Sequence, residues 1–360
     1  MMSSKEPEKL APLTYIFNPD YKTYHNPAHV LSYKNVANLF LIFGGRGTGK
    51  TTGWADYCAK QYLKNKSQFI YLRRNPNGSK AGRELLSNIL TPIKIVGMGI
   101  EGCYKYQYGN ECLGFSLALT KQNDLKSGFD FSRVTTIIYD ECSIKQTKTR
   151  RYIQDEPHEF LQLISTIVRT RTDYIIVMLS NNDDKFNIWT EYFNIPIFDN
   201  IYVDKEHGIF MEYVPHNPRL LEKEEKTPLY KLTKGTAYGS YHYENEVLTM
   251  NNLDNIKEKP AQCVIIARWV YNSKTINIYY SHSLSEIYCE FRDKVIEDKY
   301  TFKFVEGNQP NWLNIRLYKG SNLKKFIETF YYSSKWYCDA KNTATMVSTL
   351  MEEFKWQTKK

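Results

Sequence analysis

No run of apolar residues in the sequence is long enough to cross a membrane. The longest runs, such as NLFLIF, have the length of a β-strand, whereas a membrane-spanning helix needs about 20 apolar residues. The amino-terminal MMSSKEPEKL is polar and lacks the apolar stretch of a signal peptide. The seven cysteines form no C-x-x-C pair and no Cys/His spacing of a zinc site, which favours reduced thiols over a disulfide framework or a zinc module. We therefore expect a soluble intracellular protein with no membrane partner.

The composition excludes bulk disorder and leaves the kind of partner open. Hydrophobic residues make up 42% and charged residues 24% of the chain, as in ordinary globular proteins. The length of 360 residues predicts two domains with room for a small third piece. A net charge of +9 is compatible with a polyanionic partner, although many basic proteins bind no nucleic acid. The 29 tyrosines would suit stacking on bases, but an AT-rich genome is the better explanation of their number.

The sequence GGRGTGKT fits the phosphate-loop pattern G-x-x-x-x-G-K-[ST], with an apolar strand expected at 39–43 before it and a helix at 51–65 after it. The glycines let backbone N–H groups turn onto phosphate oxygens, and the helix amino terminus adds its dipole. Lys50 would carry charge to the β- and γ-phosphates, and Thr51 would offer its hydroxyl to Mg²⁺. Arg46 would either face phosphate or brace the loop. The predicted nucleotide-binding residues are Gly44, Gly45, Arg46, Gly47, Thr48, Gly49, Lys50, Thr51 and Thr52.

An apolar strand that ends in two carboxylates supplies the second half of a hydrolase site. VTTIIYDE ends in Asp140 and Glu141. Asp140 would hold Mg²⁺, and Glu141 would orient and deprotonate the attacking water. The alternative is two ordinary acidic residues after a strand. The adjacent glutamate favours hydrolysis over kinase transfer, and the absence of an N-K-x-D tetrapeptide argues against GTP. The pattern predicts an ATPase that uses ATP and Mg²⁺.

Polar and basic residues beyond these strands suggest further roles. The strand expected at 174–181 ends in Ser180 and Asn181, which would sense hydrolysis from beside the Asp140 strand. Arg169 and Arg171 precede that strand; they would either reach a neighbouring subunit's γ-phosphate or cap a helix carboxyl terminus. The stretch KQTKTRR would either meet DNA near the hydrolysis strand or form a solvated basic loop. Its candidate DNA-binding residues are Lys145, Lys148, Arg150 and Arg151.

The order of elements predicts an α/β fold. Buried-strand runs at 39–43, 69–74, 135–140 and 174–181 alternate with helical patterns, which indicates a parallel sheet with helices on both faces. We expect a motor domain at 1–217, a charged linker module at 218–248 and a second α/β or α+β domain at 249–360. The second domain would contain a hairpin around 272–274, a strand at 300–305 and helices at 321–334 and 343–356.

The motifs, taken in order, resemble those of the DNA-packaging ATPases of small phi29-like tailed phages. The resemblance is specific for residues 26–182, suggestive to about residue 250 and faint beyond. It rests on Asn26-Pro27 and Leu31-Ser32-Tyr33, then GGRGTGKT, FIYLRR, TTIIYDE, VRTR and LSN, with a weaker match in KGTAYGSYHYENEV.

The resemblance implies an ATPase of the ASCE P-loop class. Such a protein would form a homopentameric ring in the host cytoplasm, dock transiently on the procapsid portal and drive double-stranded DNA inward, with a packaging RNA as a further candidate partner. Lys50, Thr51, Asp140 and Glu141 carry over in the roles given above. Arg169 matches the trans-acting arginine finger. Lys126, in DLKSGFD, falls one residue away from a lysine that acts on the neighbour's nucleotide.

The resemblance also implies an RNase H-like carboxyl-terminal domain. Such nucleases hold two metals with several carboxylates, one of them on the first strand. The candidate first strand, CVIIARWVY, contains Arg268 but no acidic residue, which predicts a nuclease-like fold without nuclease activity. Arg268, Lys274 and FKWQTKK are candidates for gripping DNA, portal or RNA. The competing functions are a nucleotide-switched, nucleic-acid-binding assembly module and a helicase-like P-loop ATPase.

Overall fold

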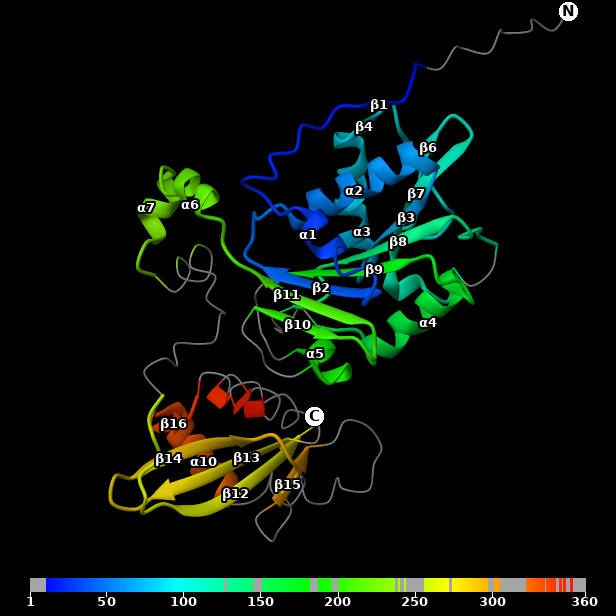
Figure 1. The fold of residues 1–360 in the computed structure, drawn as a ribbon. Helices are drawn as coiled ribbons and strands as arrows, with labels where there is room; N and C mark the ends of the chain where they lie inside the picture. The colour runs from blue at the N-terminus through cyan, green and yellow to red at the C-terminus, as the bar shows by residue number, and fades with distance from the viewer. Residues whose placement is uncertain are drawn as a thin grey trace, which may run out of the picture. The chain divides into compact units, whose positions relative to one another are not determined.

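The computed structural model forms two compact units, residues 1–183 with 198–247 and residues 184–197 with 248–360 (Figure 1). The structure describes residues 11–125, 128–144, 151–181, 187–195, 200–236, 239, 243, 256–271, 274–296, 301–304, 322–333, 335–340, 343–344, 346–347 and 350–351. Within these ranges, no helix combines the length and the apolar character that crossing a membrane requires.

A nine-stranded mixed sheet organises the first unit, in the order β10–β11–β2–β9–β8–β3–β7–β6–β5. The six strands from β11 to β7 are parallel to one another, and four of them, β2, β9, β8 and β3, are the strands that the buried apolar runs predict. The strands are β2 Leu39–Gly44, β3 Gln68–Arg73, β5 Lys94–Gly97, β6 Tyr104–Tyr108, β7 Glu111–Ala118, β8 Val134–Asp140, β9 Ile175–Ser180, β10 Ile201–Asp204 and β11 Ile209–Val214.

The predicted parallel sheet extends into antiparallel strands at both edges. β10 runs antiparallel to β11, and β5 and β6 form an antiparallel extension of β7. These pairs are antiparallel because hairpins connect their strands, and a tight turn returns the chain alongside the strand that it has just left. Only Gly109 and Asn110 separate β6 from β7, and Gly109 adopts a φ of +59°.

Helices cover both faces of this sheet, as predicted (Figure 1). Successive side chains of a strand point to opposite faces, so Ile138 and Tyr139 of β8 mark the two sides. Ile138 packs in the core with Trp54 of α2, whereas Tyr139 stacks on Phe160 of α4 at a centroid distance of 5.2 Å. The helices of the unit are α1 Pro27–Leu31, α2 Lys50–Asn65, α3 Pro76–Gly82, α4 Glu156–Val168, α6 Pro218–Glu224 and α7 Pro228–Thr233, and a small sheet pairs β1 Thr14–Tyr15 with β4 Leu90–Thr91.

The second unit contains a five-stranded sheet in the order β15–β12–β13–β14–β16. The predicted hairpin is confirmed, because β12 and β13 are antiparallel, and the predicted strand near 301 lies parallel to β12. β14 and β16 were not predicted. Phe326 and Phe330 of α10 pack on Tyr280 of β13. The elements are β12 Val264–Tyr271, β13 Lys274–Ser281, β14 Glu286–Arg292, β15 Thr301–Phe304, β16 Trp336–Cys338, α5 Ile188–Tyr192 and α10 Asn322–Tyr332, and the described residues between 343 and 351 are helical.

Candidate functional site

The glycine-rich loop folds around its own lysine. Lys50 begins α2 and is buried; its Nζ donates to the carbonyl oxygens of Gly44 and Gly45, both at 2.8 Å, and to Thr48 Oγ1 at 3.2 Å. Gly47 and Gly49 have φ values of +75° and +81°, which glycine adopts readily. The ammonium group therefore already lies in the concavity of the loop, where a phosphate would meet it. Arg46 is exposed on the outside of the loop.

The fold brings together Thr51, near the start of α2, and Asp140, at the end of β8. Thr51 Oγ1 at the start of α2 donates to Asp140 Oδ1 at the end of β8, across 3.2 Å. The second carboxylate oxygen of Asp140 accepts from Tyr71 OH at 2.7 Å and from Arg73 Nη1 at 2.9 Å. A hydroxyl and a carboxylate are hard oxygen ligands of the type that Mg²⁺ takes in nucleotide sites. Groups of three or more His, Cys, Asp or Glu side chains suited to a metal do not occur in the described residues.

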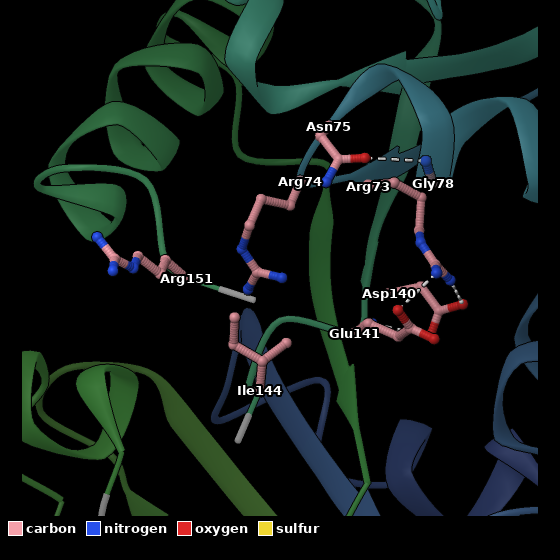
Figure 2. Close-up of a pocket in the computed structure, with 8 residues that line it drawn as sticks. All are labelled: Arg73, Arg74, Asn75, Gly78, Asp140, Glu141, Ile144 and Arg151. Atoms are coloured by element: carbon pink, nitrogen blue, oxygen red, sulfur yellow. Dashed lines mark hydrogen bonds and ion pairs between the residues drawn. The ribbon is translucent and has the colours of Figure 1, made fainter. Parts of the chain in front are cut away.

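Glu141 turns away from the strand and toward Arg73. Its φ of +56° is unusual for a residue with a side chain, and its side chain is 44% exposed. Arg73 Nη2 pairs with Glu141 Oε2 at 2.6 Å, so one guanidinium bridges both carboxylates (Figure 2). Burial opposes the charge of Arg73, but Tyr71, Asp140 and Glu141 outweigh it and raise the pKa of Arg73 above its ordinary value. The Arg73 guanidinium is therefore charged at neutral pH.

A cavity of about 160 Å³ opens beside these groups (Figure 2). Both carboxylates of the β8 end line it, together with arginines from β3, from the residue that follows β3 and from the segment before α4. The lining residues are Arg73, Arg74, Asn75, Gly78, Asp140, Glu141, Ile144 and Arg151. Of the predicted DNA-binding residues, Arg151 therefore lies at this cavity, whereas Lys145, Lys148 and Arg150 lie outside the described residues, as does Lys126.

Arg74 and Glu156 form a buried ion pair that sequence reasoning missed. Arg74 Nε and Nη2 reach the two Glu156 oxygens at 2.7 and 2.9 Å, and Nη2 also donates to the carbonyl of Cys142 at 2.8 Å. Glu156 accepts a further bond from Tyr139 OH at 2.6 Å and is fully buried as a side chain. The pair fixes the chain just after Glu141 against the start of α4. The sequence feature that could have predicted this pair is the presence of two consecutive arginines, Arg73 and Arg74, at the end of the strand beside the Asp140 strand.

The end of β9 is tied to the chain that follows Glu141. Ser180 is buried, and its Oγ donates to the carbonyl of Ser143 at 3.1 Å. Asn181 follows at the strand end and is half-buried. β9 lies between β2 and β8, so these two polar residues stand between the glycine-rich loop and the carboxylates. This is the position that the sequence predicts for a residue that senses the γ-phosphate.

The two arginines after α4 differ in their surroundings. Arg171 caps carbonyl groups, since its guanidinium donates to the backbone oxygens of Phe131, Ser132, Val134 and Ile167. Arg169 is exposed, has a φ of +52°, and its guanidinium takes part in none of the described hydrogen bonds or ion pairs. Both arginines lie at the start of β8. That strand is seven residues long and therefore spans roughly 20 Å, so Arg169 lies far from Asp140 of its own chain.

Comparison with known proteins gives consistent matches along most of the chain. The family model "Podovirus DNA encapsidation protein (Gp16)" matches residues 19–346. The DNA packaging proteins of Bacillus phages PZA and phi29 are each 24% identical over 317 residues, which cover 86% of this chain and 92% of theirs. The DNA packaging protein of Bacillus phage B103 is 29% identical over 64% of this chain and 69% of its own.

Two solved structures share the fold along the whole length of their chains. "The bacteriophage Phi-29 viral genome packaging motor assembly" aligns with a TM-score of 0.61 at 20% identity, over 92% of this chain and 99% of that chain. "The Phi-28 gp11 DNA packaging Motor" aligns with a TM-score of 0.53 at 17% identity, over 92% and 98%. With the family model matching nine-tenths of its length, this chain belongs to the Podovirus DNA encapsidation protein (Gp16) family.

Proposed function

We propose that this chain is an ATP-driven motor that packages double-stranded phage DNA into a procapsid. The observation that carries the proposal is the meeting of Thr51, Asp140 and Glu141 beside the glycine-rich loop, in a chain of the encapsidation family. The strand order β11–β2–β9–β8–β3 supports an ASCE-type P-loop ATPase, because an additional strand separates the loop strand from the strand that ends in Asp140 and Glu141.

In the proposed reaction, each residue acts on ATP held at the loop. Lys50 moves its hydrogen bonds from the loop carbonyls to the β- and γ-phosphate oxygens. Thr51 and Asp140 hold Mg²⁺, which neutralises charge on the phosphates when it is bound. Glu141 takes a proton from water as the water oxygen bonds to the γ-phosphorus and the bond to the bridging β–γ oxygen breaks, which leaves ADP and phosphate.

Arg73 holds Glu141 through one of its two carboxylate oxygens, Oε2, at 2.6 Å. This ion pair fixes where the carboxylate lies. We propose that it restrains Glu141 from turning toward the attacking water, and that release of the pair speeds turnover. Arg151 lines the same cavity as Arg73 and Glu141, and it lies in the chain segment proposed to meet DNA. DNA bound by this segment would therefore lie beside the Arg73–Glu141 pair.

The rest of the molecule would serve assembly of the motor and contact with DNA, portal or RNA. Residues 1–217 form the motor domain, residues 218–248 a linker and residues 249–360 an RNase H-like domain without nuclease activity. The antiparallel β12–β13–β14 strands with β15 beside β12 support the last assignment. Arg268 lies on β12 and donates to Asn277, and Glu290 of β14 accepts from Tyr279 and pairs with Arg292. A homopentameric ring on the portal, with DNA and a packaging RNA as partners, completes the proposal.

ATP hydrolysis by the purified chain, with and without DNA, tests the proposed activity. We expect duplex DNA to stimulate hydrolysis, and Lys50→Ala or Glu141→Gln to lower the turnover number by about 100-fold or more, the range of a lost general base. Glu206→Gln is the matched control, because Glu206 is exposed on the β10–β11 turn. Stimulation by single strands alone would favour a helicase, and nucleotide binding without DNA-stimulated turnover would favour an assembly switch.

A further inference from the structure

The hydroxyl of Tyr152 joins the two residues that flank the basic segment 145–151. Its oxygen accepts a hydrogen bond from the backbone N–H of Ile144 at 3.0 Å and donates to the carbonyl oxygen of the same residue at 3.2 Å. Ser143 Oγ lies 3.2 Å from the same hydroxyl. Ile144 precedes the basic segment and Tyr152 follows it, eight positions later in the sequence. The two ends of the segment that contains Arg151 are therefore bonded to each other.

The segment 142–144, which follows Glu141 directly, is buried and bonded to its neighbours. Its first N–H donates to the carbonyl of Leu179 on β9 at 3.0 Å, and its second carbonyl oxygen accepts from Ser180 Oγ at 3.1 Å. Its first carbonyl oxygen accepts from Arg74 Nη2 at 2.8 Å. A close-packed interior transmits a displacement to its neighbours. A shift at the end of this segment therefore reaches Glu141 and the polar end of β9.

Tyr152 is itself held beside this segment from two sides. The guanidinium carbon of Arg74 lies 5.1 Å from the centroid of its ring, and the N–H of the next residue, Ile153, donates to Glu156 Oε2 at 2.9 Å. Burial raises the pKa of Tyr152 above its ordinary value, so the hydroxyl keeps its proton at neutral pH. Tyr152 therefore connects the start of α4 with the segment 142–144. No step of the proposed hydrolysis uses this hydroxyl.

We propose that Tyr152 is a positioning residue that couples DNA contact at the segment 145–151 to hydrolysis at Glu141. The inference rests on the proposed function, in which DNA meets this segment. Arg151 and Ile144 line the cavity that Glu141 also lines (Figure 2). When a DNA phosphate draws Arg151 outward, the adjoining Tyr152 moves with it, and its hydroxyl displaces the backbone of Ile144. This displacement moves the chain that carries Glu141 and weakens the ion pair that restrains it.

The ratio of DNA-stimulated to DNA-free ATP turnover in the full-length chain tests the coupling, with Tyr152→Phe as the variant. Phenylalanine keeps the ring beside Arg74 and removes only the hydroxyl. We expect the ratio at saturating duplex DNA to fall by roughly two- to thirtyfold, the range of single-residue effects on coupling. The DNA concentration for half-maximal stimulation should stay within about twofold of the wild type, because the cations that meet phosphates are retained. A merely structural loss lowers the folded fraction, which scales both turnover numbers alike and leaves their ratio unchanged.

Tyr62→Phe is the matched control, because it removes a tyrosine hydroxyl that donates to Glu111 away from this network, and it should keep the wild-type ratio. Ser143→Ala removes the third partner of the Tyr152 hydroxyl and provides a second test if Tyr152→Phe unfolds, with a smaller fall in the ratio expected. A wild-type ratio at saturating DNA, or an equal fall in Tyr62→Phe, would overturn the proposal and leave the ATPase in place. Absence of DNA stimulation in the wild-type chain would instead contradict the proposed function itself.

Discussion

At the scale of single residues, arginine–carboxylate pairs hold the site together. The Arg74–Glu156 pair is buried, and each partner depends on the other because an unpaired charge in the interior is costly. The pair also joins β3, the chain after Glu141 and the start of α4. A side chain that is distant from the phosphates therefore determines where the carboxylate-bearing segment lies.

Glu156→Gln should destabilise the folded chain by about 3–5 kcal/mol, since it leaves Arg74 buried without a counter-charge. Thermal or denaturant unfolding measures the loss. The control is Glu84→Gln, which breaks the exposed pair of Glu84 with Arg83 and should cost less than about 1 kcal/mol. Equal losses in the two variants would show that the buried pair has no special role.

Arg73→Gln should uncouple hydrolysis from DNA. Without this guanidinium, Glu141 is no longer held by the ion pair and is free to turn toward the attacking water. We expect the DNA-free and DNA-stimulated turnover numbers to approach each other, and their ratio is the quantity to measure. A ratio equal to that of the wild type would mean that the Arg73–Glu141 pair does not restrain the base.

At the scale of elements, the sequence was informative for four of the buried strands. The apolar runs of β2, β3, β8 and β9 predicted these strands and their parallel pairing, and the contiguous motifs at Lys50 and Asp140 predicted the loop and the carboxylates. β7 and β11 were missed although they are buried. The edge strands were missed because their composition is mixed: β6 reads YKYQY, and only its central tyrosine is buried.

The part of the site that could not be predicted depends on contacts between distant residues. Arg73 reaches Asp140 across 67 positions, and Arg74 reaches Glu156 across 82. A local sequence pattern does not predict such a pair, because the two residues become neighbours only through the order of the strands in the folded sheet. A further cavity, lined by segments 23–29 and 214–218, is a similar case, because these segments become neighbours through the pairing of β11 with β2.

At the scale of the whole molecule, the tyrosine content has a structural use. Tyrosine hydroxyls repeatedly donate to carboxylates, several of which the fold buries or half-buries. Tyr15 and Tyr21 both bind Asp56 beneath the amino-terminal segment. The same pairing joins Tyr62 to Glu111, Tyr71 to Asp140, Tyr139 to Glu156, Tyr279 to Glu290 and Tyr288 to Glu286.

Variants of Arg169 test whether ATP hydrolysis uses residues from two neighbouring chains. It lies at the start of β8, roughly 20 Å along the strand from Asp140, so it should serve a neighbour's nucleotide. Mixing Arg169→Ala subunits with Glu141→Gln subunits should restore part of the ATPase activity that each lacks alone, because some interfaces then pair an intact arginine with an intact base. Arg171→Ala is the contrasting variant and should lower stability through its lost carbonyl contacts. Absence of rescue at every mixing ratio would argue for action within one chain.

Packaging of duplex DNA into procapsids that carry the portal tests the central claim most directly. With ATP and Mg²⁺, the wild-type chain should convert added DNA to a nuclease-resistant form, and Glu141→Gln should leave the DNA digestible while Glu206→Gln packages normally. Nuclease-resistant DNA at the wild-type level with Glu141→Gln would contradict the claim that hydrolysis at this carboxylate drives the DNA inward.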